Sequence, residues 1–220
     1  LWRPDGAAET GEIMGIPKSK LKKSLDALAQ IEPRFAHAIK ETGYPEERIR
    51  EPGYETLLRT IVGQQVSVAA AASVWNKLEA LLGPGCAPDK LIAQDFDALR
   101  ACGLSRQKQG YARSLAELVI SGGLPLDALP KDDEEAIAYL TKVKGIGRWS
   151  AEIYLLFAEG RADIWPAGDL AVQEGVGRLL GLPARPSEKE VREIAESWRP
   201  HRGAVAIFTW HIYAQGFQAI

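Results

Sequence analysis

The chain has 220 residues, enough for one large domain or for two small lobes with a sizeable core. Lys and Arg number 27 and Asp and Glu 29, so the formal net charge of -2 does not by itself indicate a polyanionic partner. Two cysteines are too few for a four-cysteine zinc site or an iron–sulfur cluster and indicate no disulfide framework. No apolar run approaches the roughly 20 residues of a membrane span. We therefore expect a cytoplasmic protein without membrane contact.

The first residues, Leu-Trp-Arg-Pro, contain neither an initiator Met nor a secretory pattern, so we expect a trimmed beginning. Farther along, apolar residues recur at helical spacing, and no stretch of four or more residues alternates as a half-buried strand does. The fold is therefore predicted to be all-α. Gly, Pro and capping residues delimit the predicted helices, which cover residues 18–31, a second helix from 33, 54–82, 95–101, 107–121, 132–143, 148–160, 169–180, 187–198 and 203–216.

The long Ala-rich stretch 54–82 is interrupted by Gly-Gln-Gln-Val-Ser at 63–67. Helix propensity is low there and Ser67 is a good N-cap, so two helices are predicted to meet at this point. No Pro-rich linker separates the two lobes that the length suggests, which predicts packed lobes with a cleft between them as the natural place for a site. We expect one helical domain over 54–168 and a second lobe from 1–53 plus 169–220.

Residues 140–151 read Leu-Thr-Lys-Val-Lys-Gly-Ile-Gly-Arg-Trp-Ser-Ala, which predicts a helix end, a tight turn and a second helix. Gly145 and Gly147 allow positive φ and carry no Cβ, so backbone N–H groups at the start of the next helix can point outward together. A glycine C-cap between two helices would also explain these residues. The flanking cations Lys142, Lys144 and Arg148 add a local positive field and favour phosphate binding.

About twenty residues later the sequence Trp-Pro-Ala-Gly-Asp ends at Asp169. Pro166 and Gly168 predict a turn, and Asp169 stands where a new helix begins. An Asp in such a place is most often an N-cap, so a catalytic role needs further context.

The context comes from a family resemblance. The segments 143–151 and 165–169 resemble the helix-hairpin-helix and Gly/Pro-Asp signature of the DNA glycosylase superfamily, and most of all its DNA-3-methyladenine glycosylase II (AlkA-like) family. The similarity extends over about 54–213 through the ordered blocks Ile-Val-Gly-Gln-Gln-Val-Ser-Val-Ala, Gly-Leu-Ser-Arg-Gln-Lys and Trp-Arg-Pro-His-Arg. It implies the all-α fold of that superfamily, with the hairpin at about 140–152.

The resemblance implies that Asp169 is the catalytic carboxylate, which stabilises the positive charge that develops on the deoxyribose as the base leaves. Relatives similar to endonuclease III carry a Lys two residues after the second hairpin glycine, and its amine forms a Schiff base with the sugar. This chain has Trp149 there. The expected enzyme is therefore a monofunctional hydrolase without AP-lyase activity.

The resemblance also implies a pocket for a flipped base, with Trp149 and Trp210 at aromatic positions that suit a cationic alkylated base. Core packing is the alternative for both. Gln65 falls where some members insert a Leu into the stack, and a capping or solvated role is its alternative. The expected DNA contacts are Gly145, Gly147, Lys144, Arg148, Gln65, Arg106, Lys108, Arg199 and Arg202.

No cofactor is expected to be required, although family members hold a monovalent cation on hairpin main-chain oxygens that would match Thr141, Val143 and Ile146. The predicted function is release of alkylated purines, notably 3-methyladenine, from double-stranded DNA by a monomer in base-excision repair. A glycosylase for another lesion class and a non-catalytic hairpin module that only binds DNA are the alternatives. The placement of the cations in the motif blocks predicts a basic face on a chain of nearly zero net charge.

Overall fold

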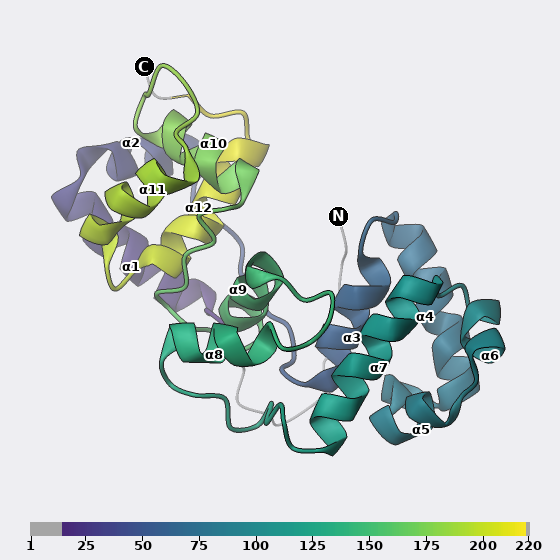
Figure 1. The fold of residues 1–220 in the computed structure, drawn as a ribbon. Helices are drawn as coiled ribbons and strands as arrows, with labels where there is room; N and C mark the ends of the chain where they lie inside the picture. The colour runs from purple at the N-terminus through teal and green to yellow at the C-terminus, as the bar shows by residue number, and fades with distance from the viewer. Residues whose placement is uncertain (1–14, 219–220) are drawn as a thin grey trace. The chain divides into compact units, whose positions relative to one another are not determined.

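The computed structural model describes residues 15–218, which are helical and contain no strand (Figure 1). The expected all-α fold is thus confirmed. The structure forms two compact units. The described part of unit 1 comprises residues 51–154, and that of unit 2 comprises residues 15–50 and 155–218. None of the helices described is both long and apolar enough to span a bilayer. The prediction about the chain's beginning lies outside the described residues.

The division between the units differs from the one expected. We predicted a domain over 54–168, whereas residues 155–168 belong to unit 2. The physical reason is that this segment bonds within unit 2, where the Gly203 N–H donates to the Ala162 carbonyl oxygen at 2.8 Å. Residues 1–14, which we assigned to the second lobe, lie outside the described range.

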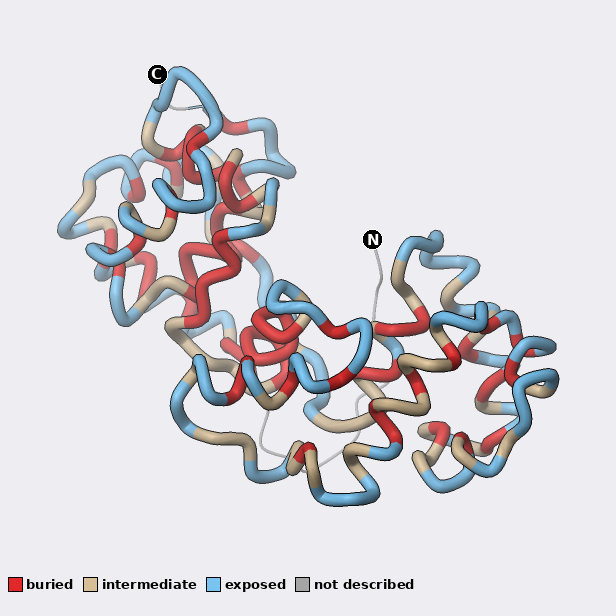
Figure 2. Tube along the Cα trace, in the orientation of Figure 1, coloured by how far each residue is buried: buried red, intermediate tan, exposed pale blue. Residues whose placement is uncertain are grey.

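Unit 1 is built around the helix α7, which packs against α3, α5 and α6. Apolar side chains on the inner faces of these helices are fully buried, and buried residues recur as red stretches along the tube in Figure 2. The unit contains α3 (Tyr54–Gly63), α4 (Val68–Leu82), η1 (Pro84–Cys86), α5 (Pro88–Ala93), α6 (Phe96–Ala101), α7 (Arg106–Ile120), α8 (Asp133–Leu140) and the beginning of α9 (Arg148–Phe157).

The predicted junction between α3 and α4 is confirmed, because Ser67 caps α4 and its Oγ accepts the Ala70 N–H at 3.2 Å. The helix α5 was not predicted. It has only six residues, so its apolar spacing is a weak signal, and it lacks the capping side chain that precedes the equally short α6.

Unit 2 is built around the helix α12, in which most side chains are buried. It packs against α1, α2 and α10. The approach of α10 to α12 is very close, since a Cβ on Gly175 would lie 2.6 Å from the carbonyl oxygen of Thr209. The unit contains α1 (Lys18–Ile31), α2 (Pro33–Thr42), α10 (Leu170–Leu179), α11 (Glu188–Ala195), η2 (Glu196–Trp198) and α12 (Arg202–Ala214).

Candidate functional site

The predicted hairpin is present in unit 1 between α8 and α9. Its turn is closed by main-chain hydrogen bonds, in which the Val143 N–H donates to Leu140 at 3.2 Å and the Ile146 N–H donates to Val143 at 3.0 Å. Gly145 has a φ of 82°, in the left-handed region that favours glycine. The expected tight turn between two helices is therefore confirmed.

The two hairpin glycines have different surroundings. A Cβ on Gly145 would lie 2.2 Å from the ring of Tyr111, so both the conformation and the packing require glycine. Gly147 has no positive φ, and a Cβ there would meet nothing within 4 Å. Packing within the described residues thus accounts for Gly145 and leaves Gly147 unexplained.

The hairpin is held on unit 1 by two side chains that the sequence did not single out. The Lys144 N–H donates to Ser114 Oγ on α7 at 3.2 Å, and Gln64 Nε2 donates to the Gly145 carbonyl oxygen at 2.8 Å. The only available signal was the position of Gln64 in the Gln-Gln pair, and nothing in the sequence distinguishes its role from that of Gln65.

One main-chain oxygen of the hairpin has the capacity to bind a cation. The Val143 carbonyl oxygen accepts a single N–H in the turn, from Ile146, and a carbonyl oxygen has two lone pairs. A monovalent cation on Thr141, Val143 and Ile146 stays a prediction. No cluster of three or more His, Cys, Asp or Glu within residues 15–218 could hold a metal ion.

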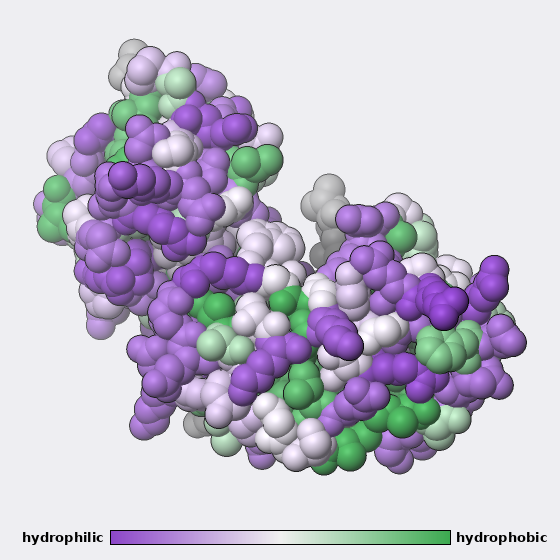
Figure 3. All heavy atoms as spheres, in the orientation of Figure 1, coloured by the Kyte–Doolittle hydropathy of each residue, from purple (hydrophilic) through white to green (hydrophobic). Residues whose placement is uncertain are grey.

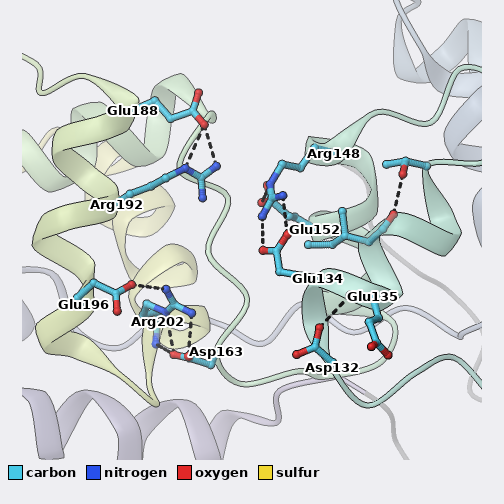
Figure 4. A network of polar contacts seen from close by, with 12 residues as sticks. Asp132, Glu134, Glu135, Arg148, Glu152, Asp163, Glu188, Arg192, Glu196 and Arg202 are labelled. Carbon is cyan, nitrogen blue, oxygen red and sulfur yellow. Dashed lines mark hydrogen bonds and ion pairs between the residues drawn. The ribbon is translucent and has the colours of Figure 1, made fainter.

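The positive field around the hairpin is weaker than expected, because Arg148 is paired with two carboxylates (Figure 4). Its Nη1 donates to Glu134 at 2.8 Å and its Nε donates to Glu152 at 2.9 Å. Hydrogen bonding to Glu134 raises the pKa of Arg148. Glu152 is buried, and its spacing of four residues from Arg148 on one helix was a signal that we did not use. Lys142 lies over the Tyr139 ring, 3.6 Å from its centroid.

The two arginines expected on DNA from unit 2 are also paired. Arg202 is 13% exposed and donates to both oxygens of Asp163, at 3.0 and 2.8 Å, and to Glu196 at 3.1 Å (Figure 4). Arg199 donates to Asp163 at 2.6 Å. These contacts favour a structural role for Arg202, and its contact with DNA stays a prediction.

Three of the cations expected on a basic face, Arg148, Arg199 and Arg202, are thus paired with carboxylates of the chain, and the basic face itself stays a prediction. On the face shown in Figure 3, hydrophilic residues surround smaller hydrophobic areas. Arg106 is exposed at the start of α7. Lys108 Nζ donates to the Val62 carbonyl oxygen at 2.7 Å, and burial lowers the pKa of this lysine.

In unit 2, Asp169 is the N-cap of α10, as the sequence predicted. One carboxylate oxygen, Oδ1, accepts three N–H groups, from the main chain of Ala171 at 2.9 Å and Val172 at 3.0 Å and from Trp210 Nε1 at 3.1 Å. Such donors stabilise a negative charge, and so does the positive end of the α10 dipole. The structure thus joins two predicted site residues, Asp169 and Trp210.

The turn before Asp169 is fixed by its neighbours. The Asp169 N–H donates to the Pro166 carbonyl oxygen at 2.9 Å, which confirms the predicted turn. The buried Gln173, which was not predicted, donates to the Ala167 carbonyl oxygen at 2.8 Å. Trp210 follows Thr209, where α12 contacts α10, so the helix packing places the indole beside the carboxylate.

The remaining predicted residues belong to unit 1. Trp149 is 48% exposed, so burial in a core does not account for it. Trp149 belongs to unit 1 and Trp210 to unit 2, so a base pocket that they share stays a prediction. Gln65 is exposed and has a φ of 55°, which is unusual for a residue other than glycine.

Comparison with known proteins identifies the family of the chain. A family model described as "HhH-GPD superfamily base excision DNA repair protein" matches residues 58–200. DNA-3-methyladenine glycosylase 1 of Schizosaccharomyces pombe is 37% identical over 165 residues, which cover 73% of this chain and 72% of that protein. DNA-3-methyladenine glycosylase 2 of Escherichia coli is 29% identical over 204 residues, covering 86% of this chain and 69% of the relative.

Two solved structures of 3-methyladenine glycosylases have a similar fold. The S. pombe 3-methyladenine DNA glycosylase Mag1 in complex with abasic DNA matches with a TM-score of 0.72 and 34% identity, covering 86% of this chain and 95% of that one. A DNA-3-methyladenine glycosidase from Bacillus halodurans matches with a TM-score of 0.79 and 27% identity, covering 88% and 92%. Since the match to the family model spans more than half of the sequence and includes both the hairpin and the turn before Asp169, the chain belongs to the HhH-GPD superfamily of base excision DNA repair proteins.

Proposed function

We propose that this chain is a DNA-3-methyladenine glycosylase that hydrolyses the N-glycosidic bond of alkylated purines and leaves the DNA strand intact. The observation that carries the proposal is the Asp169 carboxylate, held by three N–H donors on one oxygen at the start of α10. Membership of the superfamily supports the reaction class, and the names of the matched relatives support the substrate class.

The chemistry requires little more than this carboxylate. A purine alkylated on a ring nitrogen carries a positive charge and leaves as a neutral base when the bond to C1′ breaks, so no dedicated general acid is needed. The sugar then becomes oxocarbenium-like, and the negative charge of Asp169 stabilises it electrostatically. Water adds to C1′ and loses a proton, which completes the hydrolysis and leaves an abasic site.

The absence of strand cleavage follows from Trp149. An indole cannot form the Schiff base that a Lys amine forms at the matching position of bifunctional relatives. The exposed indole instead suits stacking on a base, and a cationic base gains about 0.5–2 kcal/mol from such a ring.

We propose double-stranded DNA with alkylated bases as the partner of a cytoplasmic monomer. The hairpin presents Gly147 at the start of α9, where N–H groups and the helix dipole favour a phosphate. The paired cations predict modest affinity for undamaged DNA that falls with salt, since few arginines contribute their full charge.

The test is incubation with methylated duplex DNA, with chromatographic identification of the released bases and electrophoresis of the strand. We expect free 3-methyladenine, a strand that stays intact until alkali is added, and no covalent adduct with borohydride. Release of oxidised or deaminated bases only would favour the alternative lesion class. DNA binding without release of any base would favour the non-catalytic module.

A further inference from the structure

One hydrogen bond in unit 1 joins two segments expected to contact DNA. Gln64 directly follows α3, and its Nε2 donates to the carbonyl oxygen of Gly145 in the hairpin turn at 2.8 Å, across 81 residues of sequence. The main chain of Gln64 is bonded locally, since its N–H donates to the Ile61 carbonyl oxygen at 3.3 Å. The Gln64 side chain therefore connects the junction between α3 and α4 to the hairpin.

The residues after Gln64 are exposed, and the first of them, Gln65, has a disfavoured backbone conformation. Gln65 is exposed with a φ of 55°, and its neighbours Val66 and Val68 are 45% and 53% exposed. A left-handed residue other than glycine persists only where surrounding structure determines it, and such residues cluster at functional sites. Lys108 holds the other side of the junction through its bond to the Val62 carbonyl oxygen at 2.7 Å.

The hairpin end of the bond is tightly packed. The Tyr111 ring packs against Gly145 so closely that no Cβ fits, and the Tyr111 hydroxyl accepts Gln107 Nε2 at 2.6 Å. The carbonyl oxygen that Gln64 binds therefore belongs to a packed turn. The bond fixes Gln64 relative to the hairpin, and with it the adjacent residue Gln65.

We propose that Gln64 is a positioning residue that holds the projecting Gln65 in register with the hairpin, so that Gln65 enters the base stack while the hairpin grips the strand. The proposal rests on the proposed function. Gln64 does not contact the reacting atoms in this role. Its loss should impair extrusion of a paired base far more than cleavage of a base that is already unpaired.

The experiment compares Gln64→Ala and Gln64→Glu with the wild type on 7-methylguanine placed opposite cytosine or opposite an abasic-site analogue. Gln64→Glu keeps the side-chain length but lacks the N–H donor. We expect both variants to lower kcat/KM about tenfold on the paired lesion and less than about threefold on the unpaired one, within the range of one hydrogen bond. Gln94→Ala is the matched control, because Gln94 Nε2 donates to the Lys90 carbonyl oxygen at 3.4 Å within the same unit. It should match the wild type on both substrates.

A second measurement does not require catalysis. In a duplex with an abasic-site analogue opposite 2-aminopurine, insertion of Gln65 should raise the fluorescence in the wild type and in Gln94→Ala, and much less in both Gln64 variants. Equal losses on the paired and unpaired lesions, or unchanged fluorescence in Gln64→Glu, would overturn the positioning role. If the wild type releases no base but the fluorescence still depends on Gln64, the proposed function fails and the positioning role stands.

Discussion

The two signature regions of this protein use a helix N-terminus in opposite ways. At α10 the N-terminal N–H groups bind the chain's own carboxylate, since Asp169 Oδ1 accepts from Ala171 and Val172. At α9 the preceding residue is Gly147, which has no side chain that could cap the helix. A Cβ added there would meet only open space. One helix end thus holds an anion that belongs to the protein, and the other leaves room for an anion from outside. The same backbone feature thus holds the carboxylate that we propose as catalytic and the surface that we propose binds phosphate.

The largest expected effect comes from Asp169→Asn, which separates capping from charge at α10. Asn is as good an N-cap as Asp, so the melting temperature should stay within a few degrees of the wild type. Loss of the charge should slow base release by about 10²–10³-fold, the range for removal of one electrostatic stabiliser. Single-turnover base release and DNA binding, measured on the same preparation, check both parts. Near-normal release would contradict the catalytic role.

The second largest effect is a loss of stability when Gly145 in the hairpin is replaced. Gly145→Ala places a Cβ against the Tyr111 ring in a left-handed conformation, and overpacking together with backbone strain should lower the free energy of unfolding by about 3 kcal/mol. Denaturant titration measures this loss. In a Tyr111→Ala background the ring is gone, so Gly145→Ala should cost less stability there than in the wild type, and only the backbone strain should remain. Purely additive losses would show that the ring does not determine the need for glycine.

Features that depend on residues close together in the sequence could be predicted. Asp169 was predictable as an N-cap, because capping depends on residues two and three positions away, and the resemblance supplied its chemistry. The helices followed from local periodicity in the same way. The ion pair of Glu152 with Arg148 was predictable in the same way, from its spacing of four residues on one helix, but we did not predict it.

Contacts between distant segments could not be predicted in this way. The bond from Gln64 to Gly145 and the pairing of Arg202 with Asp163 join residues 81 and 39 positions apart, and no local pattern specifies either. The total charge of the sequence was no guide, because it does not say which carboxylate lies beside which cation. The pairing of Arg148, Arg199 and Arg202 with carboxylates was missed for this reason.

The third prediction sharpens the role of the carboxylate at α10. Trp210→Phe keeps an aromatic ring beside Phe157, whose centroid lies 5.6 Å from that of Trp210, but removes the N–H that donates to Asp169. A hydrogen bond to a charged group is worth about 1.5–3 kcal/mol, and the two main-chain donors remain, so we expect kcat to fall about tenfold. Rates at saturating methylated DNA test this against Trp210→Ala, which loses the ring as well. Equal rates for Trp210→Phe and the wild type would assign Trp210 to stacking alone.

The smallest expected effect, and the most direct test of the comparison, is Gly147→Ala. The structure gives no conformational or steric reason for glycine at this position, so alanine should leave the unfolding free energy unchanged or raise it by up to about 1 kcal/mol. If the helix end receives a phosphate, however, the new methyl group stands where the strand approaches, and the loss of about one hydrogen bond should weaken DNA binding roughly fivefold. Fluorescence anisotropy with an abasic duplex measures binding, and thermal melting measures stability. A more stable protein that binds DNA less well would show that Gly147 serves the ligand and Gly145 the fold; unchanged affinity would remove the α9 end from the DNA contact.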